Sequence, residues 1–134
     1  MLIMTLGQER FRIKTLNHDH AYLMGNVEFI PLKVTMTASS EVALGRLRPL
    51  VTEYLEIVSE LGEANFNSSQ LPDDPRRLLY MAAGLLQIPQ EQKQALLEVE
   101  NLTILSKELY GIYHREVSMM RFMPTQDHAL FSVN

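Results

Sequence analysis

Residues 9–29 read ERFRIKTLNHDHAYLMGNVEF, and this stretch decides the fold of the first part of the chain. In its first half, Phe11 and Ile13 are separated by charged residues, a period of two that is typical of a β-strand with one wet face. The polar run at 17–20 favours a turn, and another strand is expected over residues 22–29. The pattern therefore predicts antiparallel strands joined by a short turn.

Signals on either side of this stretch complete the predicted β part, residues 1–38. A short strand is expected over residues 2–6, and Pro31 ends the last strand because proline has no N–H to donate. A three-stranded sheet has two open edges and is hard to stabilise alone. We therefore expect it to pair with a second copy, with a chain that supplies missing strands, or with the chain's own helices.

After residue 38 the apolar spacing changes from two to 3.6, which predicts helices. The first is expected to begin near Leu47, or to run from Glu41 with a kink at Pro49, and to end at Gly62. Ser39 and Ser40 are its candidate N-caps. Further helices are expected over residues 75–87, 89–99 and 102–120. Gly84 lies inside the second of the four, where a close crossing with another element would explain it.

The predicted fold class is therefore α+β, in a single domain of residues 1–134. A partial antiparallel β unit is followed by a bundle of about four helices over residues 39–120, and residues 121–134 form a tail without clear periodicity.

The composition is that of an ordinary globular protein, with 46% hydrophobic and 21% charged residues. There is no apolar run long enough for a transmembrane helix, and the N-terminus does not resemble a secretory signal, so a cytoplasmic location without membrane contact is expected. The absence of cysteine excludes disulfides and thiolate sites. A net charge of −4 argues against a dedicated nucleic-acid binder.

Two blocks of the sequence resemble the N-terminal, substrate-binding domain of the Lon protease family. The first is Gly7-Gln8-Glu9-Arg10-Phe11-Arg12-Ile13 followed by Tyr22-Leu23-Met24-Gly25-Asn26-Val27-Glu28. The second is Leu71-Pro72-Asp73-Asp74-Pro75, an apolar helix, and then Ile88-Pro89 with Lys93 and Leu96-Leu97-Glu98. The residues before Gly7 do not match the family's opening strands, which belong to a PUA-like barrel, so the resemblance leads us to expect an incomplete barrel.

This resemblance implies a non-catalytic domain that binds unfolded or degron-bearing proteins and contributes to oligomer contacts. A structural or oligomerisation module, and RNA binding through the PUA-like part, are the alternatives. No glycine precedes a lysine as an ATPase phosphate loop requires. Ser106 and Lys107 are adjacent on a helix and point to different faces, so they do not form a protease dyad. We therefore expect no enzymatic activity and no cofactor.

Two polar clusters invite other readings. His18, Asp19 and His20 could ligate zinc, but no fourth ligand is evident, and a solvated turn is the preferred interpretation. Residues 10, 12 and 14 form a basic strand face without interleaved aromatic residues, which is weak support for RNA binding. A metal site and a nucleic-acid partner are therefore not expected.

Eight methionines raise the possibility of an adaptable apolar binding surface, although ordinary core packing also explains them. The candidate protein-binding residues lie on or near the strands and after the last helix. They are Met24, Phe29, Met36, Met119, Met120, Phe122 and Met123.

Overall fold

The structure is a computed structural model that describes residues 7, 9–62 and 68–123. Its elements are β1 (Phe11–Asn17), β2 (Met24–Phe29), α1 (Ala38–Glu60), the 3₁₀ turn η1 (Ser68–Gln70), α2 (Pro75–Leu85), α3 (Gln90–Glu98) and α4 (Leu102–Phe122). The prediction of an α+β fold with a partial antiparallel β unit and four helices is confirmed for the described residues. The strand expected over residues 2–6 and the tail beyond residue 123 lie outside them.

Strands β1 and β2 form an antiparallel hairpin. Phe11 pairs with Phe29 and Ile13 with Val27, and the register then shifts by one residue at a bulge between Ile13 and Thr15. The two phenylalanine rings meet edge to face, with their centroids 6.5 Å apart. These cross-strand pairs place apolar side chains opposite one another along the ribbon.

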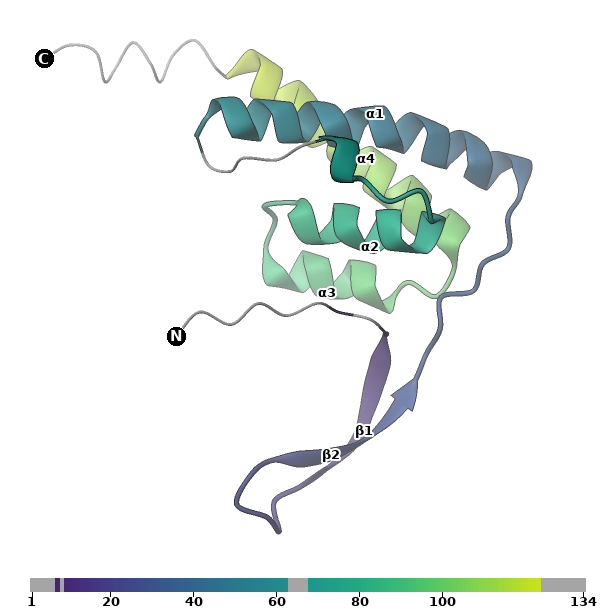
Figure 1. The fold of residues 1–134 in the computed structure, drawn as a ribbon, viewed down its shortest axis with the longest axis vertical. Coiled ribbons are helices and arrows are strands. Elements are labelled where there is room, and N and C mark those ends of the chain that lie inside the picture. Colours follow the sequence, from purple (N-terminus) through teal and green to yellow (C-terminus); the bar gives the residue numbers. More distant parts are fainter. Residues whose placement is uncertain (1–6, 8, 63–67, 124–134) are drawn as a thin grey trace, which may run out of the picture.

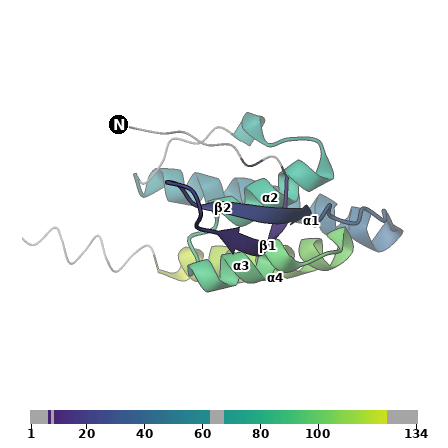
Figure 2. The same ribbon diagram turned by 90° about the horizontal axis from the view of Figure 1, so that it is seen from below.

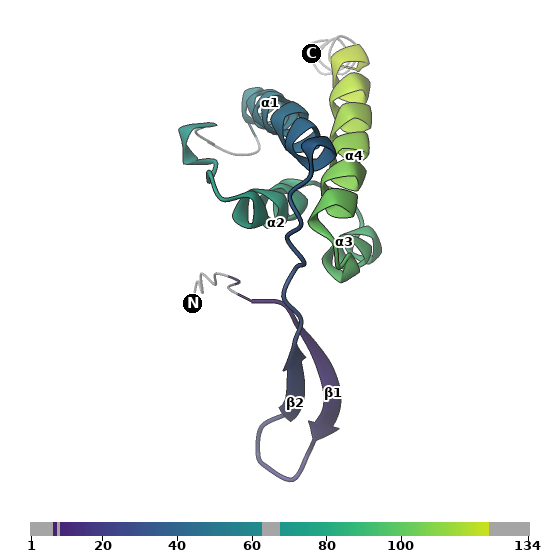
Figure 3. The same cartoon turned by 90° about the vertical axis from the view of Figure 1, so that its right-hand side faces the viewer.

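The hairpin projects away from the helices (Figures 1 and 3). Every residue of both strands is exposed, so the expectation of one wet and one covered face is wrong for the chain by itself. The physical reason is that the described helices pack together above the hairpin base and cover neither of its faces. Seen from below, α1 extends beyond the hairpin at both ends (Figure 2).

An extended segment, residues 30–37, connects the hairpin to the helices. Leu32 is buried in the helical core, with 5% of its surface exposed. Lys33 pairs in parallel with Asn101, since its N–H donates to the Glu100 carbonyl at 2.9 Å and its carbonyl accepts from the Leu102 N–H at 3.1 Å. The segment is therefore held at the start of α4.

Helix α1 begins earlier than expected and continues through Pro49. Its N-cap is Thr37, not Ser39 or Ser40: the Thr37 hydroxyl accepts from the Ser40 N–H, and the Ser40 hydroxyl accepts from the Thr37 N–H. This is a reciprocal capping box in which serine replaces the usual glutamate. The predicted end is confirmed, because Gly62 has a φ of 79° directly after the helix.

Helices α2 and α4 each begin after a capping side chain, whereas α3 begins after Pro89 without one. The Asp74 carboxylate accepts from the Arg77 N–H at 3.1 Å, with Pro75 at the first helical position. The Asn101 side chain accepts from the Thr103 N–H at 2.8 Å. Helix α4 reaches Phe122, slightly beyond its expected end.

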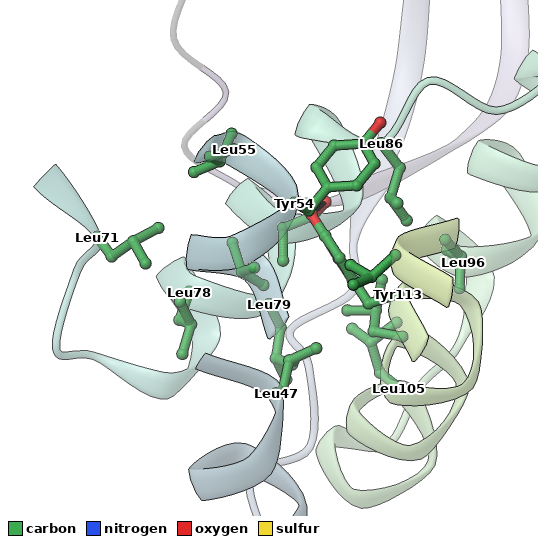
Figure 4. Close-up of a cluster of buried hydrophobic side chains, with 14 of the residues drawn as sticks. Leu47, Tyr54, Leu55, Leu71, Leu78, Leu79, Leu86, Leu96, Leu105 and Tyr113 are labelled. Carbon is green, nitrogen blue, oxygen red and sulfur yellow. Dashed lines mark hydrogen bonds between the residues drawn. The ribbon is translucent and has the colours of Figure 1, made fainter. Parts of the chain in front are cut away.

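Helix α1 packs along α4, and α2 packs against α4 and α3. The core between them is made mainly of leucines and two tyrosines, and Figure 4 shows how these side chains converge from the helices. Its residues with no measurable exposure include Leu47, Leu79, Leu86, Leu105 and Tyr113. The helical part therefore has a complete core of its own, whereas the hairpin has none.

Candidate functional site

The hairpin carries the most concentrated exposed apolar surface of the described chain. We call the following set the hairpin surface: Phe11, Ile13, Leu16, Tyr22, Leu23, Met24, Val27 and Phe29. Their exposed fractions run from 42% at Val27 to 68% at Tyr22. Large contiguous apolar surfaces on a soluble domain are typical of interaction sites. Both outer edges of the ribbon also lack a neighbouring strand in the described structure.

Few charges interrupt this surface. The Lys14 ammonium lies 2.5 Å from the Glu28 carboxylate across the two strands. Its hydrogen bond and positive charge hold the pKa of Glu28 below its usual range, with a smaller contribution from Arg12. Lys14 and Glu28 therefore neutralise each other, and the exposed surface of the hairpin is mainly apolar.

Arg10 fixes the base of the hairpin to the helices. Its Nε donates to the Ile30 carbonyl at 2.8 Å, and its Nη1 donates to the carbonyls of Leu97 and Val99 at 2.9 and 2.6 Å. The last two carbonyls belong to the final turn of α3 and its cap, where a cation also complements the helix dipole. Arg10 therefore lies outside the strand and is not part of the basic strand face that was expected.

Two hollows lie where the hairpin base meets α3. We call the first the anchor cavity; it measures about 300 Å³ and is lined by Gly7, Glu9, Arg10, Tyr80, Ala83, Gly84, Lys93 and Leu97. We call the second the groove; it measures about 520 Å³, and its lining includes Phe11, Arg12 and Ile13 of β1 and Gln94, Leu97 and Glu98 of α3. They share Glu9, Arg10 and Leu97, so they lie next to each other.

The structure separates the candidate binding residues into two groups. Met24 and Phe29 lie on the hairpin, at 43% and 61% exposure, and Met36 (43%) lies on the segment that follows. Met119, Phe122 and Met123 lie at the C-terminal end of α4, at the opposite end of the molecule (Figure 1). The two groups therefore do not form one groove.

Met120 differs from its neighbours, because it is partly buried and packs against the core. Phe122, by contrast, is the most exposed large apolar residue of the described chain, at 87%. Packing thus explains one of the candidate residues at this end of α4.

The polar candidates do not assemble into a centre. Among the described residues, no three histidine, aspartate or glutamate side chains lie close enough together to hold a metal. His20 stacks on Tyr22, with ring centroids 5.7 Å apart. Ser106 is fully buried and donates to the Thr103 carbonyl at 2.9 Å, while Lys107 is exposed.

Residue spacing did not identify the anchoring role of Arg10 or the cavity beside Gly84. Arg10 contacts carbonyls that are more than eighty residues away in sequence, and backbone carbonyls carry no sequence signal. Gly84 did carry a signal, because a glycine inside a helix needs a reason. The expected reason, a close crossing, is wrong: a Cβ at Gly84 would meet nothing within 4 Å.

No helix in the described ranges is both long and apolar enough to span a membrane.

Comparison with known proteins agrees with this architecture. The model of a family described as the ATP-dependent protease La (LON) substrate-binding domain matches residues 1–115. Lon protease 2 of Myxococcus xanthus is 27% identical over 125 residues, which is 92% of this chain. The chain covers 15% of the length of that relative. Because the family model matches most of its residues, the chain belongs to the Lon substrate-binding domain family.

Proposed function

We propose that this protein binds unfolded or degron-bearing polypeptide segments for a protease of the Lon type and does not cleave them itself. The observation that carries the proposal is the hairpin surface: every strand residue is exposed, and the cross-strand pairs Phe11–Phe29 and Ile13–Val27 place large apolar side chains together on one face of the ribbon. Soluble proteins rarely expose large apolar surfaces unless those surfaces bind a partner.

The binding mode follows from the chemistry of the ribbon. An extended client can add a strand at an open edge, where main-chain hydrogen bonds provide affinity for any sequence. Apolar client side chains would then bury the hairpin surface, at roughly 25 cal/mol for each Å² removed from water. Together these contacts favour chains that are both extended and apolar, which describes unfolded proteins better than folded ones.

The non-catalytic part of the proposal rests on the family, which is described as a substrate-binding domain. In the hairpin, the charged groups serve structural contacts: Arg10 bonds to backbone carbonyls and Lys14 pairs with Glu28. Cleavage of a bound client would accordingly be performed by other parts of a protease.

A direct test measures binding of the full chain to a reduced and alkylated, permanently unfolded protein, by fluorescence anisotropy. The double variant Ile13→Ser/Val27→Ser removes a cross-strand apolar pair from the centre of the hairpin. It should weaken binding by about tenfold or more, because each lost apolar contact is worth on the order of 1 kcal/mol. The native form of the same probe protein should not bind.

Val42→Ser is the matched control, since Val42 is 53% exposed on α1 and lies outside the hairpin surface. Phe122→Ser tests the second group of candidate residues, at the end of α4. Equal loss of affinity in Val42→Ser and in the hairpin variant would refute the proposal. Loss with Phe122→Ser alone would move the client site to α4.

Self-association is a second candidate function, and the two open edges of the hairpin favour it. Sedimentation over a range of concentrations would detect it, with the Ile13→Ser/Val27→Ser variant remaining monomeric. RNA binding has less support, because Arg10 and Lys14 are engaged in the contacts described above, which leaves Arg12 alone on the ribbon. Strongly salt-dependent binding to RNA would be its signature.

A further inference from the structure

The two faces of the hairpin differ in chemistry. One face carries large apolar side chains from both strands, which are between 42% and 61% exposed. We call it the apolar face, and its members are Phe11, Ile13, Leu16, Val27 and Phe29. Leu16 belongs to this face because one of its methyl groups would lie 3.4 Å from a Cβ added at Gly25, which points to the same side of β2 as Val27. This face therefore offers a guest apolar contacts without a charge among them.

The charged residues of the two strands lie on the opposite face. Arg12 and Glu28 are cross-strand partners there, and the Lys14 ammonium reaches the Glu28 carboxylate at 2.5 Å. Further along the ribbon, the Asn26 amide donates to the Thr15 hydroxyl at 3.1 Å. A guest that lies beside both faces is therefore best matched when one of its sides is apolar and the other is polar, because a buried charge without a partner is costly.

The backbone groups on the outer edge of β2 have no strand beside them in the described structure. The Ile30 N–H donates to the Arg10 carbonyl at 2.9 Å, so these two residues form a hydrogen-bonded pair. Hydrogen-bonded and non-hydrogen-bonded pairs alternate along an antiparallel ladder. The N–H and C=O groups of Phe29, Val27 and Gly25 therefore point outward. They recur at every second residue, which is the spacing that an added strand needs.

The outer edge of β1 is less regular. Lys14 is an extra residue between Ile13 and Thr15, so the outward groups of β1 lose the spacing of two at this bulge. Bulges and lysines are common means by which proteins keep an edge strand from pairing with another chain. Every residue of β2 has a partner in the register, and β2 contains no lysine. The edge that can accept a strand is therefore that of β2.

The length of this edge favours a client strand over a second copy of the chain. Strand β2 has six residues. A stable interface between two copies commonly uses about 20–30 residues a side, so a contact limited to this edge is too small for one. A copy paired antiparallel through its own β2, centred on Val27, would also bring Gly25 opposite Phe29. A client can place a large apolar side chain at that position.

We propose that the outer edge of β2 binds one strand of an extended client in which apolar and polar residues alternate, with the apolar residues beside Val27 and Phe29. The proposal rests on the proposed function and adds a preference for sequence pattern to it. Main-chain hydrogen bonds along β2 accept any sequence, and the two unlike faces select a period of two. A client with its apolar residues in one block gains the same hydrogen bonds, but half of its apolar side chains lie beside the charged face.

The first test compares two labelled peptides of identical composition, by fluorescence anisotropy with the full chain. In one peptide valine and threonine alternate, and in the other the valines precede the threonines; both carry the same charged residues at their ends. The alternating peptide should bind about fivefold more tightly or more, because each apolar pair on the correct face contributes to affinity. Equal affinities would overturn the preference for pattern.

Methylated peptides distinguish strand addition from general apolar attraction. Successive N–H groups of a strand point to opposite edges, so methylating the valine nitrogens and methylating the threonine nitrogens block opposite edges of the alternating peptide. One of the two sets should weaken binding by about tenfold or more, and the other should have little effect. Equal effects of the two sets would overturn strand addition, whatever the composition of the peptide.

Proline variants identify the edge. Val27→Pro removes an outward N–H from β2, and Ile13→Pro removes one from β1, since both residues belong to the same non-hydrogen-bonded pair. Val27→Pro should weaken binding of the alternating peptide by about tenfold, and Ile13→Pro should weaken it clearly less. The contact between the rings of Phe11 and Phe29, followed by NMR, verifies that each variant keeps its hairpin. Equal losses in the two variants would show that β2 is not the docking edge.

The outcomes separate this inference from the function on which it rests. If both peptides bind equally well while Ile13→Ser/Val27→Ser still loses the unfolded protein, the strand inference is overturned and the proposed function stands. If the natural chain binds neither the peptides nor the unfolded protein, both fail. A dimer that Val27→Pro dissociates and that the alternating peptide does not displace would assign the edge to a second copy, and would overturn the client strand.

Discussion

Tyr54 and Tyr113 meet edge to face in the centre of the helical core, with ring centroids 5.2 Å apart and ring planes at 85° (Figure 4). The Tyr113 hydroxyl donates to the Ala82 carbonyl at 2.7 Å, and the Tyr54 hydroxyl accepts from the Gln87 N–H at 3.1 Å. The ring contact joins α1 to α4, and the two hydrogen bonds join both helices to α2 and the residue pair that follows it. The helical part is therefore tied together by polar contacts as well as by apolar burial.

Stability should fall in alkaline solution because of Tyr113. Burial, and to a lesser extent the nearby Tyr54, raise the pKa of Tyr113 far above its usual value. In the unfolded chain this phenol loses its proton near pH ~10, whereas the folded chain retains it. The stabilisation of the fold by the protonated Tyr113 is therefore complete below about pH 10 and is lost as the pH rises further. Denaturant unfolding over a pH series measures this slope.

Tyr113→Phe is the variant that isolates the effect. At neutral pH it should lower the free energy of unfolding by about 1–3 kcal/mol, because a buried hydrogen bond is lost. Above about pH 10 its stability should decline less steeply than that of the natural chain. Equal slopes for the two proteins would show that Tyr113 does not govern the alkaline transition.

Pro49→Ala should stabilise the protein. Proline inside a helix removes one backbone hydrogen bond and crowds the preceding turn, at a cost of up to about 3 kcal/mol. Here the affected turn contains Gly45, which is exposed and has no side chain, so water can reach the carbonyl that proline leaves unpaired. The gain in stability is reduced because the unfolded chain is more flexible with alanine than with proline at this position. Chemical denaturation should show a higher midpoint; a lower one would mean that α1 requires the bend to follow α4.

The course of α1 shows what local sequence can and cannot predict. The apolar stripe through Leu47 and Val51 correctly indicated a helix packed on one face, and Gly62 correctly indicated its end. Both expected starts, Leu47 and Glu41, lie after the observed one at Ala38, because packing against α4 carries the helix through Pro49. The capping box at Thr37 was missed because its partner is Ser40 instead of the more common glutamate.

The candidate site, too, could be predicted only in part from the local sequence. Alternation in residues 9–29 predicted paired strands, and local turn chemistry was sufficient for that. It could not predict that both faces stay exposed, since coverage of a sheet depends on distant segments. Nor could it show that Arg10 turns from the strands to the end of α3, because its partners there are backbone carbonyls.

The carboxyl of Glu28 should titrate below its usual range, and the cause should be Lys14. The hydrogen bond and charge of Lys14 lower the pKa of Glu28 in the folded protein. The stabilisation by this pair is therefore present above the pKa of Glu28 in the unfolded chain, near 4.5, and is lost as the pH falls through the pKa in the folded protein. Lys14→Met should return the pKa towards its ordinary value in an NMR titration. Global stability should barely change, because the pair is exposed. A large loss of stability would show that this pair, and not Arg10, holds the ribbon in place.

Arg10→Lys should release the hairpin from the helices without unfolding them. A single ammonium cannot reach the carbonyls of Ile30, Leu97 and Val99 in the geometry of the guanidinium fork. A two-stranded ribbon without this anchor is only marginally stable in water. We therefore expect faster amide hydrogen exchange across β1 and β2, with unchanged protection in the core of α1 and α4.

The Arg10→Lys variant also tests whether holding the hairpin against the helices contributes to client binding. A hairpin that moves freely must be ordered when a client binds, and that ordering reduces affinity even though no contacting side chain has changed. Arg12→Lys is the control, because Arg12 is exposed on the ribbon and makes no ion pair in the described structure. It should leave exchange and affinity for the unfolded protein as they were. If the two variants show the same hairpin protection, the hydrogen bonds of Arg10 do not position the ribbon, and its orientation must depend on Leu32 and the bridge at Lys33.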